Sequence, residues 1–315
     1  MSLESGNVAA SIVLNDMDRS TLAAYGFRSW MLQDISEPYE VILNLFNDQR
    51  DLFGALTVGR NPVCVPVLRS YDRPQFFNVS AANNLGLHFS TGDYVVFANA
   101  DVIHPSNYLR ELVGELRRHD ICYATGARVN LSSAQTVALG PCGDYSMRHN
   151  FDFLADAEHA PRGRAMLGLS PWAILREVAV SVGGFDPRVL VHEDEDIDDR
   201  ILHFMRRQGL QGCILATASL HSYHLHHGPS AQFSGSAESM AVIEPRRLRL
   251  QADPDSTEDI VQTRLDSLPL LEKDLFDTQP PRPRPSAWGL SASASLLSRA
   301  MRRLRVTAHT LLRGE

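Results

Sequence analysis

The sequence predicts an α/β fold with a mainly parallel central sheet flanked by helices. Two observations support this prediction. Between residues 10 and 101, short apolar runs alternate with longer stretches whose apolar residues recur at helical spacing. Such alternation is typical of strands joined by right-handed helical crossovers. In addition, three of the apolar runs end in Asn or Asp, and in sheets of this kind ligands bind beyond the carboxyl ends of the strands.

Four short apolar runs are the expected strands of the first half of the chain. Helical spacing is found in two of the connecting stretches, residues 20–34 and 77–89, and Ser20 is a suitable cap for the first of these helices. The strands are expected at residues 10–14, 39–46, 65–68 and 94–98.

Composition narrows the class of protein. The chain has 315 residues, of which 44% are hydrophobic and 21% charged, so it can bury a sizeable core. Its net charge of −7 argues against a general nucleic-acid binder. No apolar run reaches the roughly 18 residues of a membrane-spanning helix. Four cysteines without CxxC spacing, and a start without secretory signal features, favour a reduced, cytoplasmic protein.

Polar residues close three of the expected strands, as Asn15-Asp16, Asn47-Asp48 and Asn99-Ala100-Asp101. Any one of these could merely form a turn or cap a helix. Three on one sheet edge favour a polar rim that can bind a metal. The sequence contains no GxGxxG and no GxxxxGK[ST], so neither dinucleotide nor P-loop binding is indicated.

A dense acidic cluster lies further along the chain. The turn Gly183-Gly184-Phe185-Asp186 leads to residues 192–200, which hold six acids among nine residues. An ordinary interpretation is a solvated helix face. However, the mutual repulsion of these acids is destabilising unless a cation lies nearby.

Four stretches, in order, resemble the family 2 glycosyltransferases of the GT-A fold. The resemblance covers roughly residues 10 to 230. The last stretch ends in an acid-rich segment that resembles the family's Glu-Asp pair. The stretches are residues 11–19 (SIVLNDMDR), 39–51 (YEVILNLFNDQRD), 82–101 (ANNLGLHFSTGDYVVFANAD) and 183–200 (GGFDPRVLVHEDEDIDDR).

The resemblance implies a nucleotide-sugar donor and a divalent metal, Mn²⁺ or Mg²⁺. Asp101 would hold the metal, together with a histidine from the segment after the last strand. His221 and His224 are both candidates for that histidine, and His227 is interpreted as part of a loop. The residues expected to contact the nucleotide-sugar are Asp16, Asn47, Asp48, Asn84, Asn99, Asp101 and Arg200.

The same resemblance implies that Asp194 is the general base and that Glu193 orients the acceptor. A carboxylate beside the acceptor hydroxyl can take its proton as the hydroxyl attacks the anomeric carbon, which inverts the configuration. The implied activity is transfer of a sugar, from a UDP-sugar by default, to a hydroxyl of a glycan or a lipid-linked acceptor, as in polysaccharide biosynthesis. Two alternatives are a non-catalytic module that binds nucleotide or glycan, and a metal-dependent hydrolase.

The sequence departs from the family pattern at three positions. Asn99 replaces the first acid of the DxD motif, Asn83 replaces the usual Arg before Asn-x-Gly, and Asn15 replaces the Pro of the first strand motif. Because Asn99 adds no charge, a bound metal would depend more on Asp101 and a histidine.

The expected domain is residues 1–235, with its nucleotide-binding half at about 10–101 and its acceptor half at about 102–235. An extension with a Pro-rich linker follows at 236–285, and then a basic amphipathic helix at 286–315. The apolar stripe of that helix is expected to pack on its own domain or on a second subunit, as in a homo-oligomer. Alternatives are peripheral contact with the inner membrane face through residues 288–313, or a flexible tail.

Overall fold

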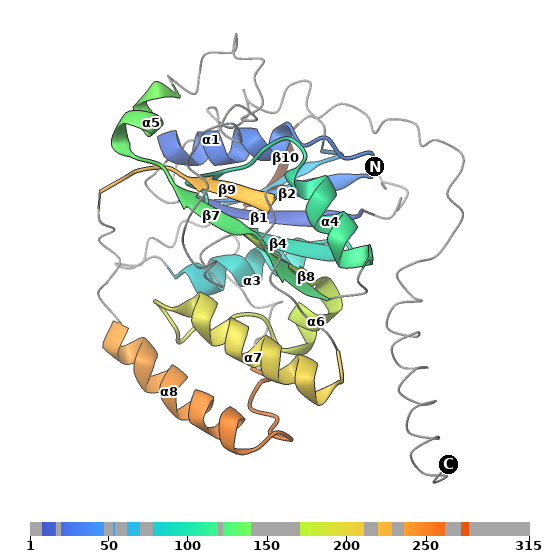
Figure 1. The fold of residues 1–315 in the computed structure, drawn as a ribbon, viewed down its shortest axis with the longest axis vertical. Coiled ribbons are helices and arrows are strands. Elements are labelled where there is room, and N and C mark those ends of the chain that lie inside the picture. Colours follow the sequence, from blue (N-terminus) through green and yellow to red (C-terminus); the bar gives the residue numbers. More distant parts are fainter. Residues whose placement is uncertain are drawn as a thin grey trace, which may run out of the picture.

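The structure is a computed structural model that describes residues 8–16, 20–46, 53, 62–69, 78–118, 122–139, 171–210, 220–228, 236–261 and 272–276. In this part of the chain the central sheet has seven strands, in the order β10-β3-β2-β1-β4-β8-β6 (Figure 1). Their bounds are β1 Ala10–Asp16, β2 Tyr39–Leu45, β3 Val65–Arg69, β4 Tyr94–Ala98, β6 Tyr123–Thr125, β8 Trp172–Leu175 and β10 Glu272–Phe276.

The centre of this sheet is parallel. Strands β3, β2, β1 and β4 pair in parallel, whereas β8, β6 and β10 are antiparallel to their neighbours. The four strands expected from the apolar runs are β1 to β4, so the predicted α/β class is confirmed. The register pairs Asn15 with Asn44, and Leu14 with Ala98. The carboxyl ends of β1, β2 and β4 therefore meet at one edge of the sheet.

Helices cover both faces of the sheet because alternate residues of each central strand point to opposite sides. In β1, Ile12 and Leu14 belong to one buried apolar cluster and Val13 belongs to the other. The first cluster includes residues of α1 (Ser20–Met31) and α4 (Tyr108–Arg118). The second includes residues of α3 (Val79–Phe89), α6 (Arg176–Ser181) and α7 (Glu193–Arg207).

A smaller sheet, in the order β5-β9-β7, lies beside the carboxyl edge of the central strands. It consists of β5 (Val102–Ile103), β9 (His221–His224) and β7 (Ala127–Asn130), and α5 (Ser133–Ala138) follows β7. Only three residues separate the end of β4 at Ala98 from the start of β5 at Val102, so this sheet lies directly at the predicted ligand edge.

The segment expected as an extension contains α8 (Ser236–Ala252), which packs along α7 (Figure 1). Arg247 of α8 forms an ion pair with Asp199 of α7, and Arg246 forms one with the buried Asp196. β10 then joins the central sheet beside β3. The division of the chain at residue 235 stays a prediction, and the expected helix at 286–315 lies outside the described residues. Among the described helices, none combines the length and apolar character needed to cross a membrane.

Candidate metal and nucleotide-sugar site

Backbone pairing brings the turn after β4 to the end of β9. Val102 pairs with His224 in the small sheet, and the carbonyl oxygen of Asp101 accepts a hydrogen bond of 2.9 Å from the amide of Leu225. The residues just after β9 are thereby held against Asp101, which itself follows β4 at the carboxyl edge of the parallel strands.

Three side chains meet at this point and form what we call the Asp101 group: Asp101, His224 and His227. Asp101 Oδ2 lies 3.0 Å from Nε2 of His227, Asp101 Oδ1 lies 3.6 Å from Nε2 of His224, and the two Nε2 atoms are 3.3 Å apart. One ligand atom from each residue lies within 4.8 Å of the others. One carboxylate and two imidazoles form a donor set that suits Mn²⁺ better than Mg²⁺, which prefers oxygen.

The structure separates the candidate histidines. His221 pairs with Ala127 at the start of β9, and it shares its face of the strand with Tyr223, a residue of the apolar core. His224 lies on the other face, with the Asp101 group. His227, which the sequence analysis assigned to a loop, belongs to the group because the chain after β9 folds back over Asp101.

Arg128 of β7 is a further residue of the site that sequence reasoning missed. In the pairing of β7 with β9, Arg128 lies opposite Ser222 and Asn130 lies opposite His224. Because alternate residues of a strand point to the same face, Arg128 shares a face of the sheet with His224. Burial lowers the pKa of Arg128, and the negative charges of Asp101 and Asp194 partly offset that effect. Arg128 is therefore a cation within electrostatic range of both the Asp101 group and the acidic helix α7.

The acid pair Glu193 and Asp194 occupies the first turn of α7, where the helix dipole favours negative charge. Both side chains are half-buried. Burial, and then the charge of Asp194, raises the pKa of Glu193 to about 7. Burial also raises the pKa of Asp194. His192, immediately before the pair, has a φ of 66°, an uncommon conformation for a residue other than glycine, and this turns the chain sharply into α7.

A third acid lies one turn further along α7. Asp198 is buried and accepts a hydrogen bond of 2.6 Å from the Tyr123 hydroxyl. Burial raises the pKa of Asp198 to about 7 against the effect of that hydrogen bond, and the charge of Asp194 acts in the same direction as burial. Asp198 and Tyr123 thus form a buried polar support beneath the acid pair.

The expected nucleotide contacts at the strand ends are only partly described. Asp16 is buried at the end of β1, and Asn99 is exposed two residues before Asp101. Asn47 and Asp48 lie outside the described residues. The structure therefore places Asp16, Asn99 and Asp101 along one edge of the sheet, beyond β1 and β4.

Two of the departures from the family pattern are bonded to each other. The Asn15 side-chain amide donates to Oδ1 of Asn83, and the Asn44 amide donates to Oδ1 of Asn15, both at 2.6 Å. Asn83, which replaces the Arg of the family pattern, thus connects α3 to the end of β1. The amide chain ties α3 to the edges of β1 and β2.

Arg200 and Asn84, both expected at the nucleotide, are buried and make hydrogen bonds within the protein. Arg200 is fully buried; its guanidinium binds Asp196 and donates to the carbonyl oxygens of Val182 and Gly184. Asn84 is also fully buried, and its amide bonds both the N–H and the carbonyl of Phe185. With these partners, both side chains fix the Gly-Gly-Phe-Asp turn.

A segment of the sequence that includes part of this site matches a known protein family. Residues 66–138 match the family model of glycosyl transferase family 2. The matched segment includes Asp101 and Arg128, and it runs from β3 to α5. It confirms the resemblance to family 2 glycosyltransferases on which the interpretation of these residues rests. No curated protein matches the chain in sequence.

Three solved structures are among those similar to this chain. TarS from S. aureus is 11% identical, with a TM-score of 0.48, over 70% of this chain and 37% of its own. GalNAc-T7 with UDP, GalNAc and Mn²⁺ is 14% identical, with a TM-score of 0.49, over 78% and 49%. The mannosyltransferase PcManGT from Pyrobaculum calidifontis, with GDP-Man and Mn²⁺, is 14% identical, with a TM-score of 0.45, over 78% and 63%. This chain spans less than two thirds of the length of each of these three proteins.

Proposed function

We propose that this protein is an inverting glycosyltransferase that moves a sugar from a nucleoside-diphosphate donor to an acceptor hydroxyl. The observation that carries the proposal is the Asp101 group at the carboxyl edge of the parallel strands. Its carboxylate, Asp101, lies within the segment that matches glycosyl transferase family 2. Ligands of α/β sheets bind at this edge. UDP-sugar is our default donor, and the acceptor hydroxyl belongs to a glycan or to a lipid-linked acceptor.

For donor binding, Asp101, His224 and His227 would hold a divalent cation, Mn²⁺ by the chemistry of the donor set. When bound, such a cation supplies Lewis-acid neutralisation of the departing diphosphate. Arg128, on the same face of the small sheet as His224, adds a permanent positive charge next to this position. Its planar guanidinium is well suited to phosphate oxygens, so we assign Arg128 to the diphosphate of the donor.

For the acceptor, Asp194 would take the hydroxyl proton and Glu193 would orient the hydroxyl. A base works best when its pKa lies near the working pH, and burial moves the pKa of Asp194 upward in that direction. With a pKa of about 7, Glu193 is partly protonated at neutral pH and can donate a hydrogen bond to an acceptor oxygen. Direct attack, with no enzyme nucleophile, inverts the anomeric carbon.

The test is release of nucleoside diphosphate from a panel of UDP- and GDP-sugars, with and without Mn²⁺, in the presence of mixed glycan acceptors. Wild type is expected to release nucleotide only with metal, and Asp101→Ala is expected to lose that release. If nucleotide binds but no sugar is ever transferred or hydrolysed, the non-catalytic module is the correct alternative. Ester hydrolysis without a nucleotide-sugar would instead identify a hydrolase.

A further inference from the structure

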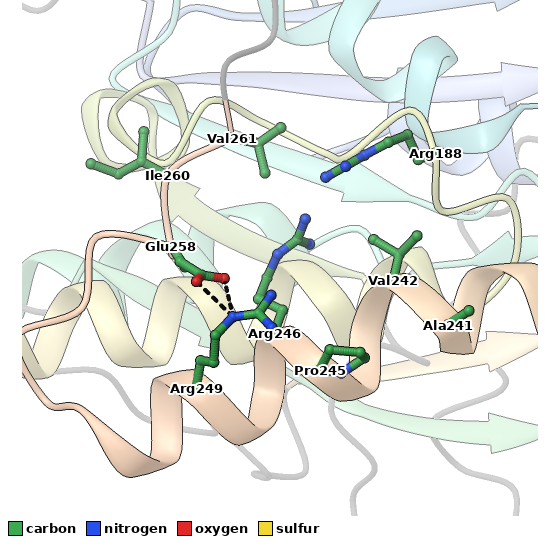
Figure 2. Close-up of a pocket in the computed structure, with 9 residues that line it drawn as sticks. All are labelled: Arg188, Ala241, Val242, Pro245, Arg246, Arg249, Glu258, Ile260 and Val261. Carbon is green, nitrogen blue, oxygen red and sulfur yellow. Dashed lines mark hydrogen bonds and ion pairs between the residues drawn. The ribbon is translucent and has the colours of Figure 1, made fainter.

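A pocket of about 420 Å³ lies between α8, the turn that leads to α7, and the segment after α8 (Figure 2). None of its residues belongs to the Asp101 group. Its lining consists of Arg188, Ala241, Val242, Pro245, Arg246, Arg249, Glu258, Ile260 and Val261.

Three arginines from two segments converge on this pocket. Figure 2 shows the guanidinium groups of Arg188, Arg246 and Arg249 directed into the space between α8 and residues 258–261. Arg246 is buried and anchored from behind by ion pairs with Asp186 and Asp196. Each of the three arginines is ion-paired with an acid, so what the pocket offers to a ligand is the N–H donors that these pairs leave unused.

Some guanidinium N–H groups of these arginines make no hydrogen bond to the described residues and are available to a ligand. Arg188 uses Nε and Nη2 for Asp186, and Arg249 uses Nε for Glu258. Within the ranges that the structure describes, no partner is recorded for Nη1 of Arg188 or for either Nη atom of Arg249. These two side chains are 67% and 54% exposed, so their unused N–H groups are accessible from solvent.

The rest of the wall is apolar and irregular. Val242, Ile260 and Val261 contribute aliphatic surface. Pro245 has no N–H, so the helical hydrogen bond that would reach the carbonyl of Ala241 is missing on the pocket side of α8. The cavity is also too large for a bare phosphate ion. An occupant would thus need an anionic head for the arginines and a body of several atoms for the apolar wall.

We propose that this pocket binds a small phosphate monoester. Guanidinium groups bind phosphate through paired, charge-assisted hydrogen bonds. The phosphate lies against Arg188 and Arg249, and the organic body lies against Val242 and Ile260. The site shares no residue with the Asp101 group, so binding of the ester requires neither the metal nor a nucleotide-sugar.

Binding would also stabilise the start of the acidic helix. Arg246, on the pocket wall, binds Asp186, the last residue of the Gly-Gly-Phe-Asp turn, and Asp196, two residues after Asp194. An anion that binds both Arg188 and Arg249 links the segment before α7 to α8 and so favours this arrangement. We therefore expect the ligand to raise the melting temperature of the protein.

Calorimetry and thermal unfolding with phenyl phosphate and inorganic phosphate, without metal, test the proposal. Phenyl phosphate is expected to bind more tightly than phosphate and to raise Tm. The double variant Arg188→Gln/Arg249→Gln is expected to weaken binding at least ~10-fold. Arg110→Gln/Arg117→Gln, which removes two exposed ion-paired arginines of α4, is the matched control and keeps wild-type affinity.

Two further variants keep the outcome decisive. Arg249→Gln alone, which loses only an exposed pair with Glu258, provides a folded test if the double variant is unstable. Asp101→Ala should bind phenyl phosphate as wild type does. Absence of binding, equal affinity in the pocket variants, or loss of binding in Asp101→Ala would each overturn the proposal. The last result would place the phosphate in the donor site instead.

Discussion

The carboxylate of Asp101 and the imidazole of His227 are in contact, with Oδ2 and Nε2 3.0 Å apart, although 126 positions separate them in the sequence. Asp101 comes from the turn after β4, and His227 comes from the loop after β9. The contact depends on the pairing of β5 with β9, which fixes the loop over the turn. It joins the carboxyl edge of the parallel sheet to the small sheet.

The first prediction concerns His227. If it is a metal ligand, His227→Ala lowers Mn²⁺ affinity by about 10- to 100-fold or more, because a three-residue donor set loses one nitrogen. His226→Ala, at an exposed neighbouring position, is the control and keeps the wild-type affinity. Titration of Mn²⁺ followed by electron paramagnetic resonance measures both. Equal affinities would remove His227 from the site.

The second prediction concerns the base. Asp194→Asn preserves shape but cannot accept a proton, so turnover should fall by about 10²- to 10⁴-fold while nucleotide affinity changes little. Glu195→Gln alters the exposed acid beside it and should retain most activity. Steady-state rates with saturating donor distinguish the two. An Asp194→Asn enzyme with normal turnover would require another base.

The third prediction is a pH dependence of stability. Glu193 has a folded-state pKa of about 7, raised from 4.5, so the native state binds its proton more tightly than the unfolded state does. The stabilisation is fully present below about pH 4.5 and is lost as the pH rises through 7. Urea unfolding of Glu193→Gln should therefore show a smaller drop in stability between pH 5 and pH 8, by on the order of 1 to 3 kcal/mol.

The control for this experiment is Glu238→Gln, at an exposed position of α8, which should keep the wild-type drop between the two pH values. Asp198, with a pKa also near 7, contributes in the same direction and remains in both variants. A residual pH dependence in Glu193→Gln is thus expected. An unchanged drop in Glu193→Gln would show that Glu193 is ionised normally in the folded protein.

The fourth prediction concerns Arg200. Arg200→Met leaves Asp196 short of one partner and removes the donors to the carbonyls of Val182 and Gly184, so it should cost about 3 to 5 kcal/mol of stability. Nucleotide affinity, measured below the unfolding transition, should stay near wild type. Arg206→Met, on the exposed side of the same helix, should change neither. A selective loss of nucleotide binding would restore Arg200 to the donor site.

Local sequence was sufficient to predict the central strands and the edge where the site lies. Each of β1 to β4 is a short apolar run, and the position of Asp101 after β4 follows from the strand itself. The alternation of β9 also separates His221 from His224. These features depend on neighbours along the chain, which a single sequence displays directly.

The remainder depends on contacts between distant segments. His227 reaches Asp101 only because its loop folds back, and Arg128 faces His224 only through the register of β7 and β9. Arg200 is an internal support because its charge is enclosed by the Gly-Gly-Phe-Asp turn and by Asp259, 59 residues away. Nothing in the acidic run at residues 192–200 indicates that it is covered by arginines of α8.

The most direct test of the account is calorimetric titration of UDP and GDP, each with and without Mn²⁺, into wild type, Asp101→Ala and the control His226→Ala. We predict that one nucleotide binds wild type and the control in the presence of Mn²⁺, and that this binding is lost in Asp101→Ala. Equal binding of nucleotide to Asp101→Ala, or no binding of either nucleotide to wild type with metal, would contradict the assignment of the Asp101 group as the donor site.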